Sequence, residues 1–196
     1  MAHEIRCDCL IIIRKRSQKY RDRTAKVRAL ARIRSIRMNY RAYRREDAAA
    51  IATIFTRSVV EVACQDYSAA QINAWALCAL SPEQVHAQCT DGRTVMVAVD
   101  HVEKPIAYGD LEADGHIDHL YCSPEVVGMG VASALYDELE TIACARGFDR
   151  IYTEASEAAR RLLSRKGFVV TAERDFEIDG VPIHNYAMEK VLTKAL

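Results

Sequence analysis

The chain lacks any apolar run that approaches the roughly 18–20 uninterrupted residues of a membrane-spanning helix. Near the N-terminus the longest apolar run, residues 10–13, is four residues long and is followed by Arg14-Lys15-Arg16. A secretory signal carries its charges before the apolar core and a small-residue cleavage site after it, so this segment does not fit one. We therefore expect a cytoplasmic protein that is not bound to a membrane.

Zinc-ribbon spacing is also absent from the cysteines. Cys7 and Cys9 would supply only two ligands, which do not make a metal site. Most of the cysteines lie in apolar stretches, a pattern typical of reduced, buried thiols in a cytoplasmic protein. The sequence therefore predicts no metal cofactor. The seven cysteines are Cys7, Cys9, Cys64, Cys78, Cys89, Cys122 and Cys144.

An excess of charge of either sign is missing as well, because 27 basic residues balance 27 acidic ones over the 196 residues. Residues 1–37, however, carry twelve basic and three acidic residues, a net charge of +9, which leaves −9 for the rest of the chain. An acidic main domain argues against binding of nucleic-acid phosphates there. We therefore do not expect nucleic acid to be its partner.

Residues 1–37 contain too few apolar residues to offset the entropy cost of folding on their own. The segment that opens with Met38 reads like the start of a domain. We therefore predict that residues 1–37 are a basic, disordered or artefactual extension and that residues 38–196 form one domain. An organelle transit peptide and an arm that binds nucleic acid remain open as alternatives for the extension.

From Met38 onward the chain alternates between strand-like and helix-like patterns. Asp47, Ser68, Ser81 and Ser156 stand where helices are expected to begin. The expected helices are residues 47–63, a stretch that begins at residue 68, and residues 81–89, 131–146 and 157–166. The expected strands are residues 39–44, 94–99, 106–112, 116–122, 150–153, 168–174 and 181–191.

Two glycines separate the strand that ends at residue 122 from the helix that begins at residue 131. Ser123-Pro124 ends the strand, and Gly128 and Gly130 follow one residue apart. The first backbone N–H groups of a helix have no intrahelical partner, and the helix dipole adds positive potential there. Because these glycines carry no Cβ, a ligand can approach the amides closely. The loop therefore predicts an anion-binding site.

The order of elements and several motifs resemble the GNAT superfamily of acetyl-coenzyme-A-dependent acyltransferases over residues 38–192. The family's loop signature is Gln/Arg-x-x-Gly-x-Gly/Ala, which residues 127–132 (Val-Gly-Met-Gly-Val-Ala) resemble. Gly167-Phe168 is similar to the turn that closes the family's second half, and residues 186–190 suit its last strand. Residues 110–112, 117–121 and 154–156 resemble the YafP-like branch in particular.

The resemblance implies the GNAT fold of the α/β (α+β) class, a central mixed, mostly antiparallel, twisted sheet of about six to seven strands flanked by helices. It implies that strand 116–122 splays from its parallel neighbour 150–153. The acyl-pantetheine arm would bind the splayed strand through backbone hydrogen bonds, and the pyrophosphate would bind the loop amides. The implied coenzyme-binding residues are Leu120, Tyr121, Cys122, Val127, Gly128, Met129, Gly130, Val131, Ala132 and Ser133.

This loop departs from the family pattern at two positions. Val127 stands where the signature has Gln or Arg, and Met129 stands where a basic residue is common. Both departures remove side chains that would face the phosphates, but the backbone donors remain. The resemblance therefore still implies that the coenzyme binds.

The implied activity is transfer of an acetyl or other short acyl group from acyl-coenzyme A, with acetyl-CoA as co-substrate, to the primary amine of a small-molecule or peptide acceptor. The amine attacks directly a thioester polarised by the amide of Leu120 or Tyr121. Many members protonate the leaving thiolate with a tyrosine at the place of Leu163, which has no proton to donate. The thiol of coenzyme A is acidic enough to leave with help from water.

Two alternative functions stay open, and in both of them the protein is not an active enzyme. One is a coenzyme A-binding sensor or inactive GNAT protein, suggested by Leu163. The other is a nucleic-acid-binding regulator that uses the basic N-terminal arm. Whichever of the three functions holds, we expect the protein to be a monomer or a homodimer.

A general base has to take a proton from the acceptor ammonium. On a regular strand, side chains 116, 118 and 120 share one face and side chains 117, 119 and 121 share the other. In the GNAT family, acidic or histidine residues on the first of these faces frequently act as the base. Asp118 is the first candidate, because its hydrophobic neighbours would raise its pKa by desolvation. His116, which titrates near neutrality, is the second, and Glu112 is the third.

Other polar and aromatic side chains have possible roles on the acceptor side. Glu154 either orients the substrate or serves the helix cap at Ser156. His184 and Tyr186 are expected to line the acceptor pocket. The early helices carry Phe55, Tyr67 and Trp75, which favour a small, partly apolar acceptor, although core packing explains the same residues.

Overall fold

The structure, a computed structural model, describes residues 38–193. The predictions for the basic segment 1–37 concern residues outside this range and stay predictions. None of the helices within residues 38–193 is long and apolar enough to cross a membrane.

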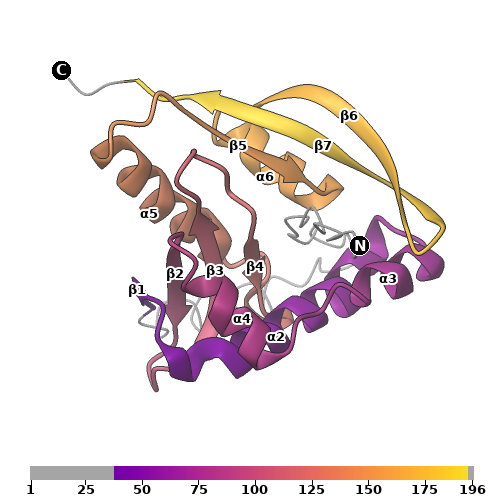
Figure 1. Cartoon of the computed structure of the whole chain (residues 1–196), viewed down its shortest axis with the longest axis horizontal. Coiled ribbons are helices and arrows are strands. Elements are labelled where there is room, and N and C mark those ends of the chain that lie inside the picture. The colour runs from indigo at the N-terminus through magenta and orange to yellow at the C-terminus, as the bar shows by residue number, and fades with distance from the viewer. Residues whose placement is uncertain (1–37, 194–196) are drawn as a thin grey trace, which may run out of the picture.

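Within residues 38–193, seven strands form two sheets, which are arranged side by side in Figure 1. The first sheet is antiparallel and has the order β1-β2-β3-β4, with β1 Asn39–Ala42, β2 Thr94–Val99, β3 Pro105–Leu111 and β4 Leu120–Cys122. The second is antiparallel and has the order β5-β7-β6, with β5 Arg150–Ala155, β6 Val169–Ile178 and β7 Val181–Val191.

The two sheets are joined at one place by a short parallel contact between His116 and Tyr152. Ile117 N donates to Tyr152 O over 2.9 Å, and Tyr152 N donates to Gly115 O over 3.1 Å. The hydroxyl of Thr153 donates to Ile117 O over 2.7 Å. Beyond this contact β4 and β5 belong to separate sheets, so the splayed, mostly antiparallel sheet of the GNAT fold is confirmed.

The helices begin close to the expected positions. Ser68 and Ser81 each accept a hydrogen bond from the backbone N–H three residues later, and the hydroxyl of Ser156 does the same for Ala159. The α-helices are α2 Ala48–Arg57, α3 Ala69–Ala76, α4 Pro82–Cys89, α5 Val131–Ala145 and α6 Glu157–Arg165. Short turns of other helix types are η1 Arg45–Asp47, η2 Ser58–Val62, η3 Ala63–Gln65 and η4 Pro124–Val126.

Asp47 does not cap α2 with its side chain, contrary to the prediction. Its carboxylate accepts two hydrogen bonds from the guanidinium of Arg41, over 2.7 and 2.9 Å. It also accepts the backbone N–H of Arg44 over 2.8 Å. The buried carboxylate therefore ties β1 to the turn that precedes α2, because a charge out of water needs such partners.

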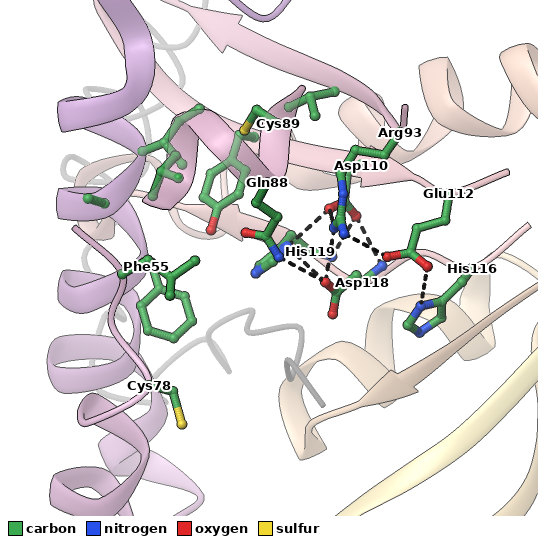
Figure 2. A pocket seen from close by; sticks show the side chains of 16 residues that line it. Phe55, Cys78, Gln88, Cys89, Arg93, Asp110, Glu112, His116, Asp118 and His119 are labelled. Atoms are coloured by element: carbon green, nitrogen blue, oxygen red, sulfur yellow. Dashed lines mark hydrogen bonds and ion pairs between the residues drawn. The ribbon is translucent and has the colours of Figure 1, made fainter. Parts of the chain in front are cut away.

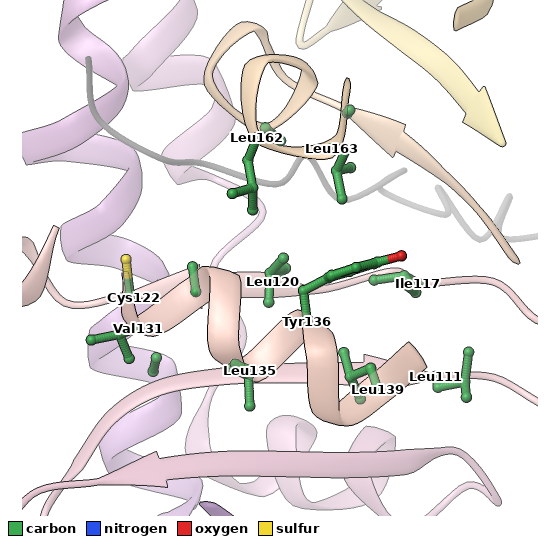
Figure 3. Close-up of a cluster of buried hydrophobic side chains, with 14 of the residues drawn as sticks. Leu111, Ile117, Leu120, Cys122, Val131, Leu135, Tyr136, Leu139, Leu162 and Leu163 are labelled. Atoms are coloured by element: carbon green, nitrogen blue, oxygen red, sulfur yellow. The ribbon is translucent and has the colours of Figure 1, made fainter. Parts of the chain in front are cut away.

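Helices cover both faces of the first sheet, and the sheet separates two hydrophobic clusters. On one face α5 packs on β2, β3 and β4, and Figure 3 shows Leu135 and Leu139 of α5 close to Leu120 of β4. On the other face α2 packs on β3 and β4, with Ile51 and Phe55 in the second cluster. Apolar side chains at helical spacing thus give each helix one buried face.

The predicted strand 116–122 is regular only over Leu120–Cys122. Asp110 N donates to His119 O over 3.0 Å, and Glu112 N donates to His116 O over 2.8 Å. Two steps along β3 therefore correspond to three steps along the opposing chain, which is the signature of a β-bulge. Asp110 stabilises the bulge, because its Oδ1 accepts the N–H groups of Asp118 and His119 over 3.0 and 2.7 Å.

The bulge makes the predicted alternation of faces wrong. Ile117 lies in the same cluster as Leu120 and Cys122, on the α5 face (Figure 3). Asp118 and His119, although adjacent in sequence, both line a cavity on the α2 face. The extra residue of the bulge shifts the alternation by one position. In a regular strand, by contrast, two adjacent side chains never lie on the same face.

Among the described cysteines, Cys64, Cys89, Cys122 and Cys144 carry free thiols, as predicted. Only Cys122 of these four is buried, whereas Cys64 and Cys144 are exposed. Cys78 is disulfide-bonded, so the expectation of reduced thiols throughout the chain is wrong at this residue.

We predict that Gly115→Ala weakens the joint between the two sheets. A Cβ at Gly115 would lie 2.7 Å from the carbonyl oxygen of Arg150, and the φ of +93° is already unfavourable for an L-residue. Gly167 is a matched control, because its φ is +92° and its Cβ would meet nothing closer than 3.6 Å. Both alanine variants lose the roughly 1–2 kcal/mol of a left-handed residue. Urea unfolding should show a clearly larger loss for Gly115→Ala, and equal losses would contradict the clash.

Candidate active site

A cavity of about 320 Å³ lies between the helices α2 and α4 and the first sheet. One side of it is apolar and the other is strongly polar, as Figure 2 shows. The apolar side is lined by Ile51, Ala52, Phe55, Cys78, Leu80, Val85, Cys89, Val95 and Tyr108. The polar side is lined by Gln88, Arg93, Asp110, Glu112, His116, Asp118 and His119.

Arg93 lies at the centre of the polar side, and its side chain is only 8% exposed. Its guanidinium nitrogens lie within 2.7–3.0 Å of four carboxylates, those of Asp91, Asp110, Glu112 and Asp118. Such charge-assisted contacts fix both the cation and its partners in place. Sequence reasoning missed Arg93, because an arginine beside a turn usually faces solvent.

Asp110 and His119 form a buried pair beside Arg93. The Nδ1 atom of His119 lies 3.0 Å from Oδ2 of Asp110, and Phe55 and Tyr108 flank the imidazole ring. Burial alone would raise the pKa of Asp110, but His119 and Arg93 outweigh it and lower the pKa. Asp110 is therefore an ionised carboxylate that positions the bulge and the ring.

Asp118, the first candidate for the base, lines the cavity, but its surroundings differ from those that the sequence predicted. Its carboxylate contacts Arg93 over 3.0 Å, the amide of Gln88 over 3.3 Å and the ring of His119 over 3.4 Å. The expected apolar surroundings of Asp118 are therefore absent. Glu112, the third candidate, also lines the cavity and contacts Arg93 over 2.8 Å.

His116 lies where the two sheets join. Its Nε2 is 2.7 Å from Glu154, its Nδ1 is 3.5 Å from Glu112, and its ring stacks on Tyr152. Burial would lower the pKa of His116, but the hydrogen bond and charge of Glu154, with Asp118 and Glu112, raise it to about 9. At neutral pH the imidazole is therefore charged and donates protons, which does not suit the role of a base.

Glu154 has a clear structural role. Besides His116, it contacts Arg174 of β6 over 3.2 Å. These contacts link the second sheet to the cavity. The cap at Ser156 does not use Glu154, because the hydroxyl of Ser156 itself accepts the N–H of Ala159.

Three side chains of the polar wall also offer atoms that could ligate a metal. Asp110, Asp118 and His119 place one ligand atom each within 4.8 Å of one another. The guanidinium of Arg93 already contacts both carboxylates. A metal ion at this place would therefore have to compete with the guanidinium for both carboxylates.

The glycine loop leads into α5 with open amides. Ala134 N makes the first i→i−4 bond of the helix, to Gly130 O over 3.0 Å. The N–H groups of residues 131–133 precede it and have no intrahelical acceptor. A Cβ at Gly128 or Gly130 would meet nothing within 4 Å, so the loop surface is open. The amide of Met129, in contrast, already donates to Val126 O over 3.1 Å.

The backbone N–H and C=O groups of β4 point alternately to β3 and to the gap between β4 and β5, which we call the splay. His119 O and Ser123 N both bond to β3, over 3.0 and 2.8 Å. Since backbone groups alternate along an antiparallel strand, the amide of Tyr121 also points to β3, and that of Leu120 points to the splay. Leu120 therefore suits the polarising role and Tyr121 does not.

The remaining sequence candidates divide between the core and the cavity. Leu163 is fully buried in the cluster that α5 forms with the first sheet. Cys122 is buried in the same cluster, and burial raises the pKa of its thiol to about 12, which does not suit a nucleophile. Of the three aromatic candidates, Phe55 lines the cavity, whereas Tyr67 and Trp75 do not. His184 and Tyr186 do not line this cavity, and their role in the acceptor pocket stays a prediction.

Ser58 is a second residue that sequence reasoning missed. It is fully buried in η2, and its hydroxyl donates to the carbonyl of Cys122 over 2.6 Å. This carbonyl is one of the backbone groups expected near the pantetheine arm. No local sequence signal identifies the contact, which joins residues 64 positions apart.

Comparison with known proteins gives the family. The acetyltransferase (GNAT) domain profile matches residues 63–190. The uncharacterized N-acetyltransferase YafP of Escherichia coli (strain K12) is 29% identical over 148 residues, which cover 76% of this chain and 92% of YafP. The chain belongs to the GNAT acetyltransferases, which take the acyl group from acyl-coenzyme A.

Solved structures agree with this assignment. A GCN5-related N-acetyltransferase from Rhodopseudomonas palustris is 33% identical, with a TM-score of 0.73 over 79% of this chain and 95% of that one. A GNAT superfamily phosphinothricin acetyltransferase from Sinorhizobium meliloti, solved in complex with AcCoA, is 21% identical, with a TM-score of 0.64 over 79% and 88% of the two chains. At this lower identity the second likeness concerns the fold alone.

The raised pKa of His116 predicts a pH-dependent contribution to stability. A pKa near 9 instead of 6.5 corresponds to about 3 kcal/mol of unfolding free energy. Because the folded-state pKa is the higher one, this contribution is fully present below pH 6.5 and is lost as the pH rises through 9. Urea unfolding across this window should show a steeper fall in the wild type than in His116→Gln. The exposed His101→Gln is the control, and equal slopes in all three proteins would contradict the prediction.

Proposed function

We propose that residues 38–196 form a catalytic domain that transfers an acetyl or other short acyl group from acyl-coenzyme A to the primary amine of a small acceptor. The observation that carries the proposal is the continuity between cavity and strand. Asp118 and His119 line the cavity, and the next residue, Leu120, directs its amide into the splay. An amine held in the cavity would therefore lie beside a thioester held along β4.

The coenzyme would bind in two parts. Its pyrophosphate would accept hydrogen bonds from the open amides at the start of α5, where the helix dipole favours an anion. Its pantetheine arm would lie in the splay beside Leu120 and Cys122. The AcCoA complex of the Sinorhizobium meliloti relative supports a coenzyme of this kind. Val127, Gly128, Met129, Gly130, Val131, Ala132 and Ser133 would form the wall of the phosphate site.

The chemistry needs a polarised thioester and a base. The amide of Leu120 would donate to the thioester oxygen and stabilise the charge that develops on it. Asp118 remains our first candidate for the base, because its carboxylate directly precedes this part of the chain and is only 13% exposed. His116 is charged at neutral pH, and Glu112 is 30% exposed. Water would protonate the leaving thiolate, because Leu163 has no proton to donate.

We predict that acetyl-coenzyme A raises the melting temperature of the protein, whereas NAD and ATP do so much less. A ligand that binds only the folded state stabilises it by mass action. Gly130→Val should abolish the shift, because its side chain would stand over the open amides. Gly147→Val is the matched control at the other end of α5, where φ is also positive and the space is also open. An unchanged shift in Gly130→Val would place the pyrophosphate elsewhere.

We predict that Asp118→Asn lowers kcat by roughly 10²–10⁴-fold, the usual share of general base catalysis. The change keeps the shape of the side chain but removes its proton affinity, so coenzyme affinity should change little. The measurement is thiol release against pH. The base should also carry the acidic limb of the pH–rate profile. If Asp118→Asn keeps near-full activity and this limb, the assignment is wrong, and Glu112→Gln and His116→Gln show whether another candidate takes the role.

A further inference from the structure

The polar wall of the cavity contains more carboxylates than cations. Asp110, Glu112 and Asp118 belong to the lining, and Asp91 and Glu154 contact its cations from behind. Against these five carboxylates stand three cations in direct contact, Arg93, His116 and Arg174. Even a protonated His119 would leave one carboxylate in excess. The wall therefore attracts a cation and repels an anion.

The cations of the wall are already paired. Arg93 contacts four carboxylates, and His116 lies between Glu154 and Glu112. An incoming carboxylate would have to compete with these short contacts for a partner. A buried anion that fails to find one is strongly disfavoured, because it has lost its hydration.

The opposite wall has different chemistry. Ile51, Phe55, Leu80, Val85 and Val95 face the cavity, and Val85 and Val95 are only 5% exposed. These side chains suit an uncharged hydrocarbon or aromatic body. A second ammonium group placed there would lose water without gaining a partner. The volume of about 320 Å³ is typical of a site for a small molecule.

We propose that the acceptor is a small primary amine with an apolar, uncharged body, whose ammonium group docks on the Asp118–Glu112 side of the cavity. Free amino acids and other amines that carry a carboxylate are rejected by the wall charge. This inference rests on the proposed function, since it assumes that the cavity is the acceptor site.

The test compares three amines of equal chain length: hexylamine, ω-aminohexanoate and ω-aminohexanamide. Thiol release from acetyl-coenzyme A gives kcat/KM for each. We expect hexylamine to exceed ω-aminohexanoate by on the order of 100-fold, because the far carboxylate would lose its hydration at the apolar wall and would also feel the carboxylates of the polar wall. The neutral amide should recover much of the difference, which separates charge from polarity. Spermidine, a cation without an apolar end, should be a poor acceptor.

A charge variant sharpens the comparison. Glu112→Gln should reduce the preference for hexylamine over ω-aminohexanoate by about tenfold, which corresponds to one weakened charge contact. Glu138→Gln on α5 removes the same charge from the opposite face of the sheet and should leave the preference unchanged. Equal use of hexylamine and ω-aminohexanoate by the wild type would overturn the inference and leave the proposed function standing.

Binding provides a readout that does not depend on turnover. In the presence of coenzyme A, hexylamine should raise the melting temperature more than ω-aminohexanoate does. If no amine supports thiol release, the proposed function fails, and this binding difference still decides the inference. If no amine shifts the melting temperature, or the carboxylate shifts it equally, the inference fails.

Discussion

The ion pairs of Arg93 hold together the polar wall of the cavity. The guanidinium joins the turn before β2 to Asp110 and Glu112 near the end of β3, and to Asp118 in the bulge. Asp110 then uses its second oxygen for the backbone of Asp118 and His119. Removal of Arg93 would leave several partly buried carboxylates close together without the cation they share, which is far more costly than the loss of a surface ion pair. The cavity wall is therefore a single electrostatic unit.

This unit also explains why the polar wall faces the α2 helix. A regular strand would send adjacent residues to opposite faces, but the bulge sends Asp118 and His119 to the same face. Ile117 and Leu120 remain with the α5 core. The chain thus gains two polar side chains for the cavity without losing the apolar side chains that bind the first sheet to α5. The strand recovers its regular pairing at Leu120, where the splay begins.

Local signals in the sequence predicted most of the fold. Three helix starts are marked by serines whose hydroxyls accept a backbone N–H three residues later, namely Ser68, Ser81 and Ser156. The glycine loop is also a local signal, because the spacing of its glycines between a strand and a helix is visible in the sequence. The bulge was missed because strand alternation assumes regular pairing. Arg93 and Asp118 are 25 residues apart, and His116 and Glu154 are 38 apart, so neither the charge of His116 nor the surroundings of Asp118 follow from local sequence. Long-range ion pairs decided the chemistry of the site, and they become visible only in three dimensions.

The position of Ser58 links the cavity to the gap between β4 and β5. Helix α2 lines the cavity with Phe55, and one turn later Ser58 holds the carbonyl of Cys122. The helix changes to π-helical winding at this serine, an irregularity that often accompanies function. A pantetheine amide that reaches the same carbonyl would meet the serine hydroxyl, and any displacement would pass along α2 to the cavity wall. If the cavity and this gap bind the two substrates as proposed, such coupling would be reciprocal, and occupancy of either site would alter affinity at the other.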